Sequence, residues 1–222
     1  MSFYEQLVAE TVESRDVFLK IPLVRNALRN GASRSLYLDF LGEAYHHVKH
    51  TFPLLALASS RTSDERYQDA LVEYMEEERG HEKWILNDIH ALGGDADAVR
   101  DGQGGPACRI MVGYAYYAIE HVSAYAFLGS IHVLEGMSVL LADQLADVMK
   151  ASLGLETDSG FSYLRTHGSL DAEHVAFFQK LADGFEDHET RRIIIDNAII
   201  FYRLYGAIFR DLGVRAELSH AA

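Results

Sequence analysis

Apolar residues recur every three or four positions along most of the chain, which is the spacing of one face of an α-helix. No segment shows a convincing alternation of apolar and polar residues, so no β-strand is predicted. The helix-breaking residues are gathered at a few places, namely Pro22, Pro53, Gly93-Gly94, Gly102 to Gly105 and Pro106. The pattern therefore predicts an all-α protein whose helices are joined by short connections.

The helices follow from the apolar segments between these breaks. Thr62 to Glu65 resembles a capping box that opens a long helix, and Pro53 is expected to kink the helix before it. The predicted helices cover residues 3–20, 22–30, 33–60, 64–91, 107–135, 135–152, 160–183 and 188–212, with a loop over 93–106 and a frayed tail after 212. We expect one domain, residues 1–222, built as an antiparallel bundle of about seven helices.

Charge and cysteine content narrow the classes of function. The 20 Lys and Arg residues face 33 Asp and Glu residues, a net charge of −13, so nucleic acid is not an expected partner. The single cysteine, Cys108, excludes an intramolecular disulfide. Neither a secretory signal nor a long uncharged apolar stretch is recognisable, so we expect a cytoplasmic protein without a membrane partner.

The strongest chemical pattern is His167, Asp171 and His174, at offsets of four and seven residues. On a helix these three side chains share one stripe. Two imidazoles and a carboxylate suit iron, manganese or zinc, although a polar helix face exposed to solvent has the same spacing. The pattern therefore predicts a metal site only in combination with other ligands.

Two further segments can supply those ligands. Glu78 and His81 form an E-x-x-H pair on the predicted helix 64–91, although Glu76 to Glu78 also resembles a solvated acidic run. Glu135 lies in an apolar stretch, where a buried carboxylate needs a cation or hydrogen-bond donors. Together the three segments carry three carboxylates and three histidines, which fits a dinuclear site inside a helical bundle.

A competing pattern begins earlier in the chain. Glu43 followed by Glu78/His81, Glu135 and Asp171/His174 imitates the ligand order of ferritin-like four-helix di-iron bundles, the alternative fold. In that arrangement Glu43 is a ligand and His167 is not. In the first arrangement the helix around Glu43 lines a substrate pocket or packs in the core. The possible pocket residues are Glu43, Tyr45, His46, His47, Lys49, His50, Tyr117 and Arg203.

The chain resembles the haem-oxygenase-like superfamily, which includes TenA and PqqC, over about residues 15–210. The resemblance lies in Ile21-Pro22-Leu23-Val24, in Tyr45-x-x-Val48-x-His50 and, more specifically, in the His167/Asp171/His174 pattern with Glu135 upstream. Within the superfamily it is closest to the haem-oxygenase-like di-iron oxidases. The resemblance implies a bundle of about seven helices with iron near its centre.

The same resemblance implies a function. It points to an O2-dependent non-haem di-iron oxidase or oxygenase with two iron ions per chain, the second of them labile. Its metal ligands would be His81, Glu135, His167, Asp171 and His174, with Glu78, or Glu77 as a fallback, as the first carboxylate. The substrate would be a small amino acid, amine or fatty-acid-like molecule, an external reductant could take part, and a homodimer is expected.

Other branches of the superfamily give the alternative function. This is a metal-independent TenA- or PqqC-like enzyme or binding protein for a small heterocycle, with a pocket built on Glu43, Tyr45 and His47. TenA-like thiaminases use a pocket cysteine, and here the only candidate is Cys108 after the Gly-rich segment. Haem oxygenases use a histidine near the N-terminus, and the first 45 residues contain none.

Overall fold

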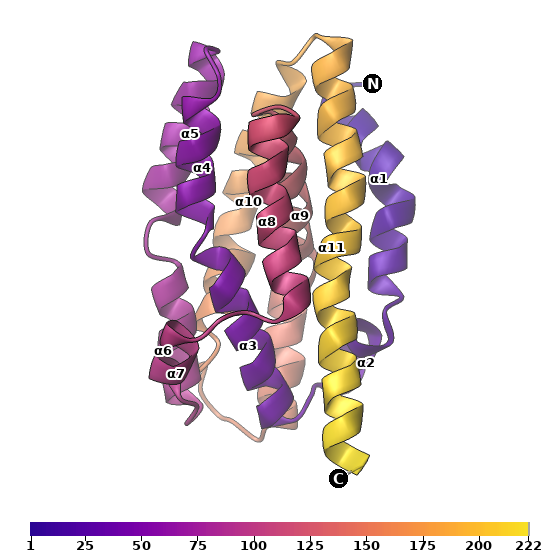
Figure 1. The fold of residues 1–222 in the computed structure, drawn as a ribbon. Coiled ribbons are helices and arrows are strands. Elements are labelled where there is room, and N and C mark those ends of the chain that lie inside the picture. The colour runs from indigo at the N-terminus through magenta and orange to yellow at the C-terminus, as the bar shows by residue number, and fades with distance from the viewer. Residues whose placement is uncertain (222) are drawn as a thin grey trace.

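The computed structural model describes residues 1–221, apart from the side chains of residues 167–174 and 219–221. Within residues 1–221 the regular elements are all α-helices, as predicted. They are α1 (Phe3–Leu19), α2 (Pro22–Asn30), α3 (Arg34–Val48), α4 (Thr51–Ser60), α5 (Glu65–Glu78), α6 (Glu82–Ala91), α7 (Ala96–Asp101), α8 (Pro106–His121), α9 (Ala126–Ser152), α10 (Ser162–Asp183) and α11 (His188–Ala221). Figure 1 shows the long helices running side by side along one direction.

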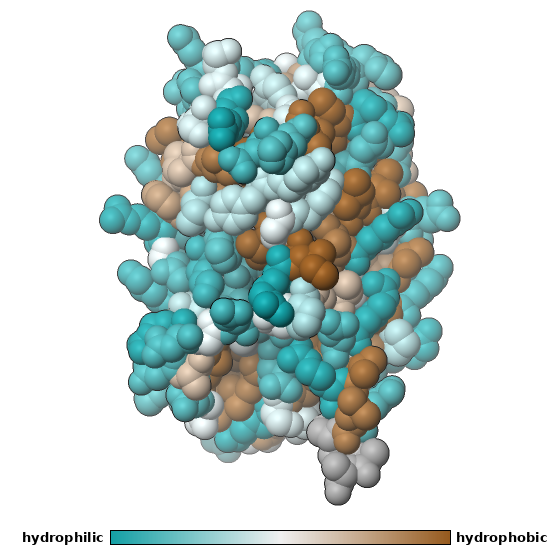
Figure 2. All heavy atoms as spheres, viewed as in Figure 1, coloured by the Kyte–Doolittle hydropathy of each residue, from teal (hydrophilic) through white to brown (hydrophobic). Residues whose placement is uncertain are grey.

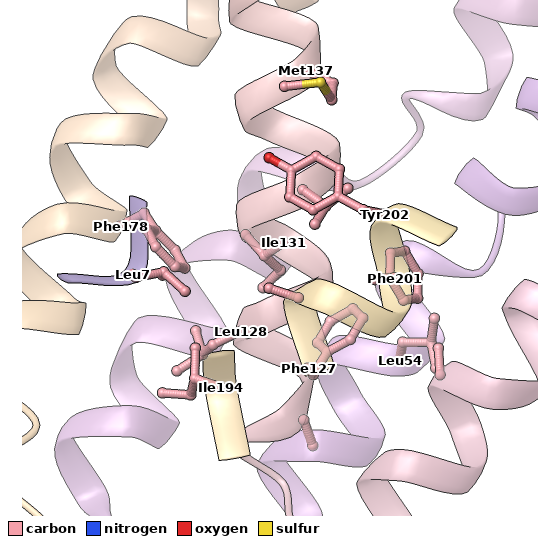
Figure 3. Packing of buried hydrophobic residues seen from close by; sticks show 14 of the residues in the cluster. Leu7, Leu54, Phe127, Leu128, Ile131, Met137, Phe178, Ile194, Phe201 and Tyr202 are labelled. Carbon is pink, nitrogen blue, oxygen red and sulfur yellow. The ribbon is translucent and has the colours of Figure 1, made fainter. Parts of the chain in front are cut away.

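Helix α9 occupies the centre of the bundle and packs against α10, α11, α2 and α8. By length and composition it could cross a membrane, but half of its apolar window is buried among the other helices. Buried aromatic and aliphatic side chains of α1, α4, α10 and α11 pack against those of α9. Figure 3 shows this for Ile131 of α9, Phe178 of α10 and Phe201 of α11. This burial is the main source of stability, because apolar area removed from water contributes about 25 cal/mol per Å².

Close contact between α9 and α11 depends on a small residue. A Cβ atom added to Gly129 would lie 2.5 Å from the carbonyl oxygen of Ile194. The buried Asn197 side chain donates hydrogen bonds to the carbonyl oxygen of Ala126 at 2.5 Å and to Ser130 Oγ at 3.0 Å. Only glycine permits this approach of the two backbones, so the central pair of helices is fixed in register here.

Several predicted helices are interrupted. The segment 33–60 is two helices, because the ring of Pro53 clashes with the carbonyl group one turn earlier and the helix breaks at residues 49–50 rather than kinking at the proline. The predicted break near Glu135 was wrong, since α9 continues through it and the break lies at residues 122–125. Helix α11 extends to Ala221 instead of ending near Leu212, and a short helix, α7, lies inside the predicted loop.

The face that carries α8 and α11 is mainly hydrophilic, with apolar side chains between the polar ones (Figure 2). Exposed apolar residues of these two helices include Ile110, Tyr117 and Val214. Exposed apolar side chains of this kind are ordinary on single-chain proteins. The predicted homodimer therefore stays a prediction.

The start of α10 is held in place by α6. Asp88, which is 2% exposed, accepts hydrogen bonds from the backbone N–H groups of Ser162 and Tyr163 and from the Ser162 hydroxyl, at 2.7 to 2.9 Å. These backbone groups have no partner inside the helix, so Asp88 acts as an N-cap donated by another helix. The contact positions the helix that carries residues 167–174.

We expect Asp88→Ala to lower the free energy of unfolding by about 2–4 kcal/mol, because it leaves several buried donors without an acceptor. Urea denaturation followed by circular dichroism measures this. The matched control is Asp95→Ala, which removes an exposed cap with one hydrogen bond to the backbone of Ala98 and should cost about 1 kcal/mol or less. Equal effects of the two substitutions would contradict the role given to Asp88.

Candidate functional site

Two of the predicted carboxylates line one cavity in the middle of the bundle. Glu78 is the last residue of α5 and Glu135 lies in α9, and both side chains belong to the wall of this cavity. The rest of the described wall is almost entirely apolar, with residues from α2, α3, α8 and α11. Acidic groups in apolar surroundings lose hydration, a cost that hydrogen-bond donors or a bound cation can offset.

The two candidates for the first carboxylate differ in burial and in the direction they face. The Glu78 side chain is 11% exposed and faces the cavity, whereas Glu77 is exposed on the other side of α5. One turn before Glu78, Tyr74 also lines the cavity. Burial raises the pKa of Tyr74 well above its usual range, and the charges of Glu135, Glu77 and Glu78 add to the shift, so this hydroxyl stays protonated.

The E-x-x-H pair does not lie on one continuous helix, which corrects the prediction. Helix α5 ends at Glu78, Gly80 has a φ of 95°, and His81 is the N-cap residue that precedes α6. Three successive glutamates at the negative end of a helix dipole disfavour its continuation, and Gly80 supplies the left-handed conformation of the turn. Even so, His81 Nδ1 lies 3.2 Å from Glu78 Oε2, and the His81 ring stacks on Trp84.

The remaining predicted ligands, His167, Asp171 and His174, lie in α10, and their side chains lie outside the described part of the structure. The backbone of α10 is helical over this segment and packs along α9. The ring of Phe177, three residues beyond His174, packs edge to face against the Tyr74 ring of α5, with 5.1 Å between the ring centroids. Among the described side chains no three His, Cys, Asp or Glu residues converge, so the site as predicted depends on α10.

Glu43 is engaged elsewhere. Its carboxylate accepts a hydrogen bond from the backbone N–H of Gly105 at 2.9 Å and forms an ion pair with Arg215 at 2.6 Å. It does not belong to the described cavity wall. The contact ties α3, the Gly-rich segment and α11 together. In this structure Glu43 therefore has a structural role, unlike its role as a ligand in the ferritin-like arrangement.

Of the eight possible pocket residues, only His47 is part of the described cavity wall, where its ring meets Tyr205 edge to face. The others make contacts outside it. Lys49 contacts His46 Nδ1 at 3.1 Å and the Tyr45 ring, and His50 Nδ1 contacts the Tyr116 hydroxyl at 3.1 Å. Tyr117 and Arg203 are exposed.

His132 is a buried histidine that the sequence patterns did not single out. It lies one turn before Glu135, packs against the rings of Tyr4, Phe178 and Tyr202, and contacts Thr11 Oγ1 through Nε2 at 3.3 Å. Burial, with a smaller contribution from Arg15, lowers its pKa to about 4. Its aromatic surroundings make it a neutral core residue, and no spacing in the sequence distinguishes it from a ligand.

The helices of this chain are arranged as in proteins with the haem-oxygenase-like fold. A domain of unknown function with a heme oxygenase-like fold from Shewanella denitrificans is similar, with a TM-score of 0.87, 21% identity and coverage of 99% of this chain and 95% of that one. A TenA homolog from Pseudomonas syringae pv. tomato has a TM-score of 0.79, 12% identity and coverage of 95% and 92%. Heme oxygenase-1 from Synechocystis in complex with heme has a TM-score of 0.77 and 12% identity, and the match covers 100% of this chain and 96% of that one.

Residues 38–206 match the family described as "Iron-containing redox enzyme". The match covers most of the chain, so the chain belongs to this family. No curated protein matches it. The resemblance to the haem-oxygenase-like superfamily and the all-α fold are confirmed, and the ferritin-like alternative was wrong, because the helices follow the haem-oxygenase-like arrangement.

His132 gives a prediction for pH dependence. The unfolded chain binds a proton at the ordinary pKa near 6.5 and the folded protein only near 4. Its contribution to stability is therefore complete above pH of about 6.5 and is lost as the pH falls towards 4. The free energy of unfolding should fall when the pH is lowered from about 7 to about 4.5. In His132→Gln this fall should be smaller by roughly 2 kcal/mol. The control is the exposed His188→Gln, and an unchanged pH profile in His132→Gln would contradict the prediction.

Proposed function

We propose that this protein is an O2-dependent non-haem iron oxidase that binds two iron ions between α5, α9 and α10 and oxidises a small substrate in the adjoining cavity. The observation that carries the proposal is the pair Glu78 and Glu135, which come from separate helices and line one apolar cavity. His81 contacts Glu78, and the helix that carries His167, Asp171 and His174 packs beside them. Membership in a family of iron-containing redox enzymes supports it.

The residue types of the candidate site fit iron. Mixed carboxylate and imidazole ligands suit iron, and carboxylates on separate helices of a bundle can hold two ions. When bound, iron would supply the electrons that activate O2. The family match alone would fit either haem or non-haem iron, and the two glutamates in the cavity wall favour the non-haem form.

The chain's own residues would prepare the cavity for this chemistry. Glu78 and Glu135 supply anionic oxygen ligands, and the contact with Glu78 orients the His81 ring. The protonated Tyr74 hydroxyl can donate a hydrogen bond towards the carboxylates. The apolar wall excludes water, which protects reactive oxygen species from side reactions.

The alternative, a metal-independent TenA- or PqqC-like enzyme or binding protein for a small heterocycle, shares the fold and is supported by the TenA homologs among the similar structures. His47 of its expected pocket does line the cavity. However, Glu43 is paired with Arg215, and Cys108 is buried beneath α3, with its thiol 3.6 Å from the Glu43 carbonyl oxygen. Burial raises the Cys108 pKa to about 12, so the thiol is a poor nucleophile, which favours the iron-dependent function.

The test is an anaerobic titration of metal-free protein with Fe(II), followed by admission of O2. We expect about two iron ions bound per chain and then O2 consumption with a transient absorption change. Glu135→Gln and Glu78→Gln should each weaken iron binding at least about ten-fold, because each replaces an anionic ligand with a neutral amide. The matched control is Glu76→Gln, an exposed position two residues from Glu78.

Each outcome decides between the alternatives. Absence of iron binding would contradict the proposal and favour the TenA-like function. Iron binding that is equally weakened by Glu76→Gln and Glu78→Gln would show attraction by the acidic run rather than a site in the cavity.

A further inference from the structure

Helices α8 and α11 lie side by side at the surface and run in opposite directions. Glu43 contacts both the backbone of Gly105, which precedes α8, and Arg215, near the end of α11. The start of α8 therefore lies towards the later part of α11, and Figure 1 shows the two helices next to each other. We call the surface that they share the α8–α11 face.

The midpoint of the α8–α11 face lies at Tyr114 and Asp196. Burial raises the pKa of Tyr114, and the charges of Tyr117 and Asp196 add to the shift, which places Asp196 of α11 near this tyrosine of α8. Because the helices are antiparallel, residues of α8 before Tyr114 and residues of α11 after Asp196 lie at the same end of the face. Residues of α8 after Tyr114 and residues of α11 before Asp196 lie at the other end.

The middle of the α8–α11 face carries apolar and aromatic side chains. Ile110 is 60% exposed, Tyr117 54% and Ile200 37%. Steps of three and four residues place side chains of α8 on one exposed stripe, which consists of Ile110, Tyr114, Tyr117 and His121. Figure 2 shows apolar side chains between the polar ones on this face. Exposed aromatic side chains are enriched where proteins bind one another.

Charged residues are divided between the two ends of the α8–α11 face. Arg109 and Arg203 lie at the end where α8 begins, Glu120 and Glu189 lie at the other end, and all four residues are exposed. Glu120 forms an ion pair with Arg61 at 2.9 Å, and within the described residues the other three form none. The face is therefore basic at one end and acidic at the other.

The remaining charges of α11 on this face offset one another locally. Arg192 pairs with Asp196 at 2.9 Å, and Arg210 is followed directly by Asp211. They leave the difference between the two ends unchanged. A partner that carries charges of one sign only would meet like charges at one end of the face, whereas a second copy of this chain, turned end to end, meets opposite charges at both ends.

The spacing of the four charged residues suits a twofold axis. Arg109 and Glu120 are eleven residues apart, about three helical turns, and Arg203 and Glu189 are fourteen apart, about four turns. Each pair therefore lies on one flank of its helix. The midpoint between Arg109 and Glu120 falls at residues 114–115, and that between Glu189 and Arg203 falls at Asp196, the two places that meet at the centre of the face. Rotation about an axis across the helices at this level brings each arginine beside the glutamate of its own pair in the second copy.

We infer that the α8–α11 face binds a second copy of this chain as a twofold dimer. Arg109 faces Glu120 of the partner subunit, Arg203 faces Glu189 of the partner subunit, and the apolar middle of the face excludes water between them. The symmetry makes each pair twice, which doubles the effect of every substitution. The candidate iron ligands take no part in this contact, so the dimer does not rest on the proposed function.

The oligomeric state of the metal-free full-length protein tests the inference. Size-exclusion chromatography with light scattering at about 10 μM protein should give a mass of about 50 kDa, twice the 24.9 kDa of one chain. Ile110→Glu, which places a charge among the apolar and aromatic side chains of the contact, should raise the dissociation constant at least about ten-fold. A monomer at about 100 μM, or a dimer that Ile110→Glu does not weaken, would overturn the inference.

Charge reversal tests the pairing of the two ends by sedimentation velocity. Arg203→Glu and Glu189→Arg should each raise the dissociation constant at least about ten-fold, because each brings like charges together at two places. The double variant should return to within about three-fold of the unchanged protein, because it restores opposite charges. General repulsion between acidic chains predicts a different result, since Glu189→Arg makes the chain less acidic. The control is Glu73→Arg, the same change of charge at an exposed position on α5.

The outcomes separate the possible causes. A double variant as weak as the single variants would contradict the twofold pairing, and a dimer unaffected by Arg203→Glu would place the contact on another face and overturn the inference. Circular dichroism checks the fold of each variant, and Arg203→Glu decides alone if Glu189→Arg, in the first turn of α11, fails to fold. Iron binding by a monomer would keep the oxidase and remove the dimer.

Discussion

The structure depends on the burial of α9. This helix is apolar on most of its surface, so it can be stable only when other helices surround it. Helices α10, α11, α2 and α8 do so, and Gly129 lets the α11 backbone approach closely. Because α9 passes through the middle of the bundle, its buried side chains form much of the core. Glu135 faces a cavity, which is why this one helix determines both the core and the candidate site.

The site combines rigid and interrupted elements. Helices α9 and α10 are continuous past it, and Asp88 fixes the start of α10 through three hydrogen bonds. Helix α5, by contrast, ends at Glu78, so Glu78 and His81 are positioned by a turn rather than by helical spacing. Two of the candidate segments are therefore held by helix packing, and the third depends on contacts such as the stacking of His81 on Trp84.

The same fold serves proteins that bind haem and TenA homologs, so the fold alone does not select a chemistry. The contents of the cavity do. In this chain the cavity combines two carboxylates with an otherwise almost entirely apolar described wall, while Glu43 and Cys108 are engaged outside it. The described wall therefore offers carboxylates, which are suited to a metal ion, and gives no place to a cysteine nucleophile.

The sequence by itself determined the helical class, the family resemblance and the segments that carry candidate ligands, because apolar periodicity and ligand spacing are local properties. It also placed α1, α2 and α10 nearly correctly, since their ends coincide with prolines and glycines. Only the tertiary structure decided that Glu78 rather than Glu77 faces the cavity, that Glu43 pairs with Arg215, and that α5 ends before His81. These outcomes depend on which residues distant in sequence meet, and the sum of many packing contacts, rather than any local spacing, settles that.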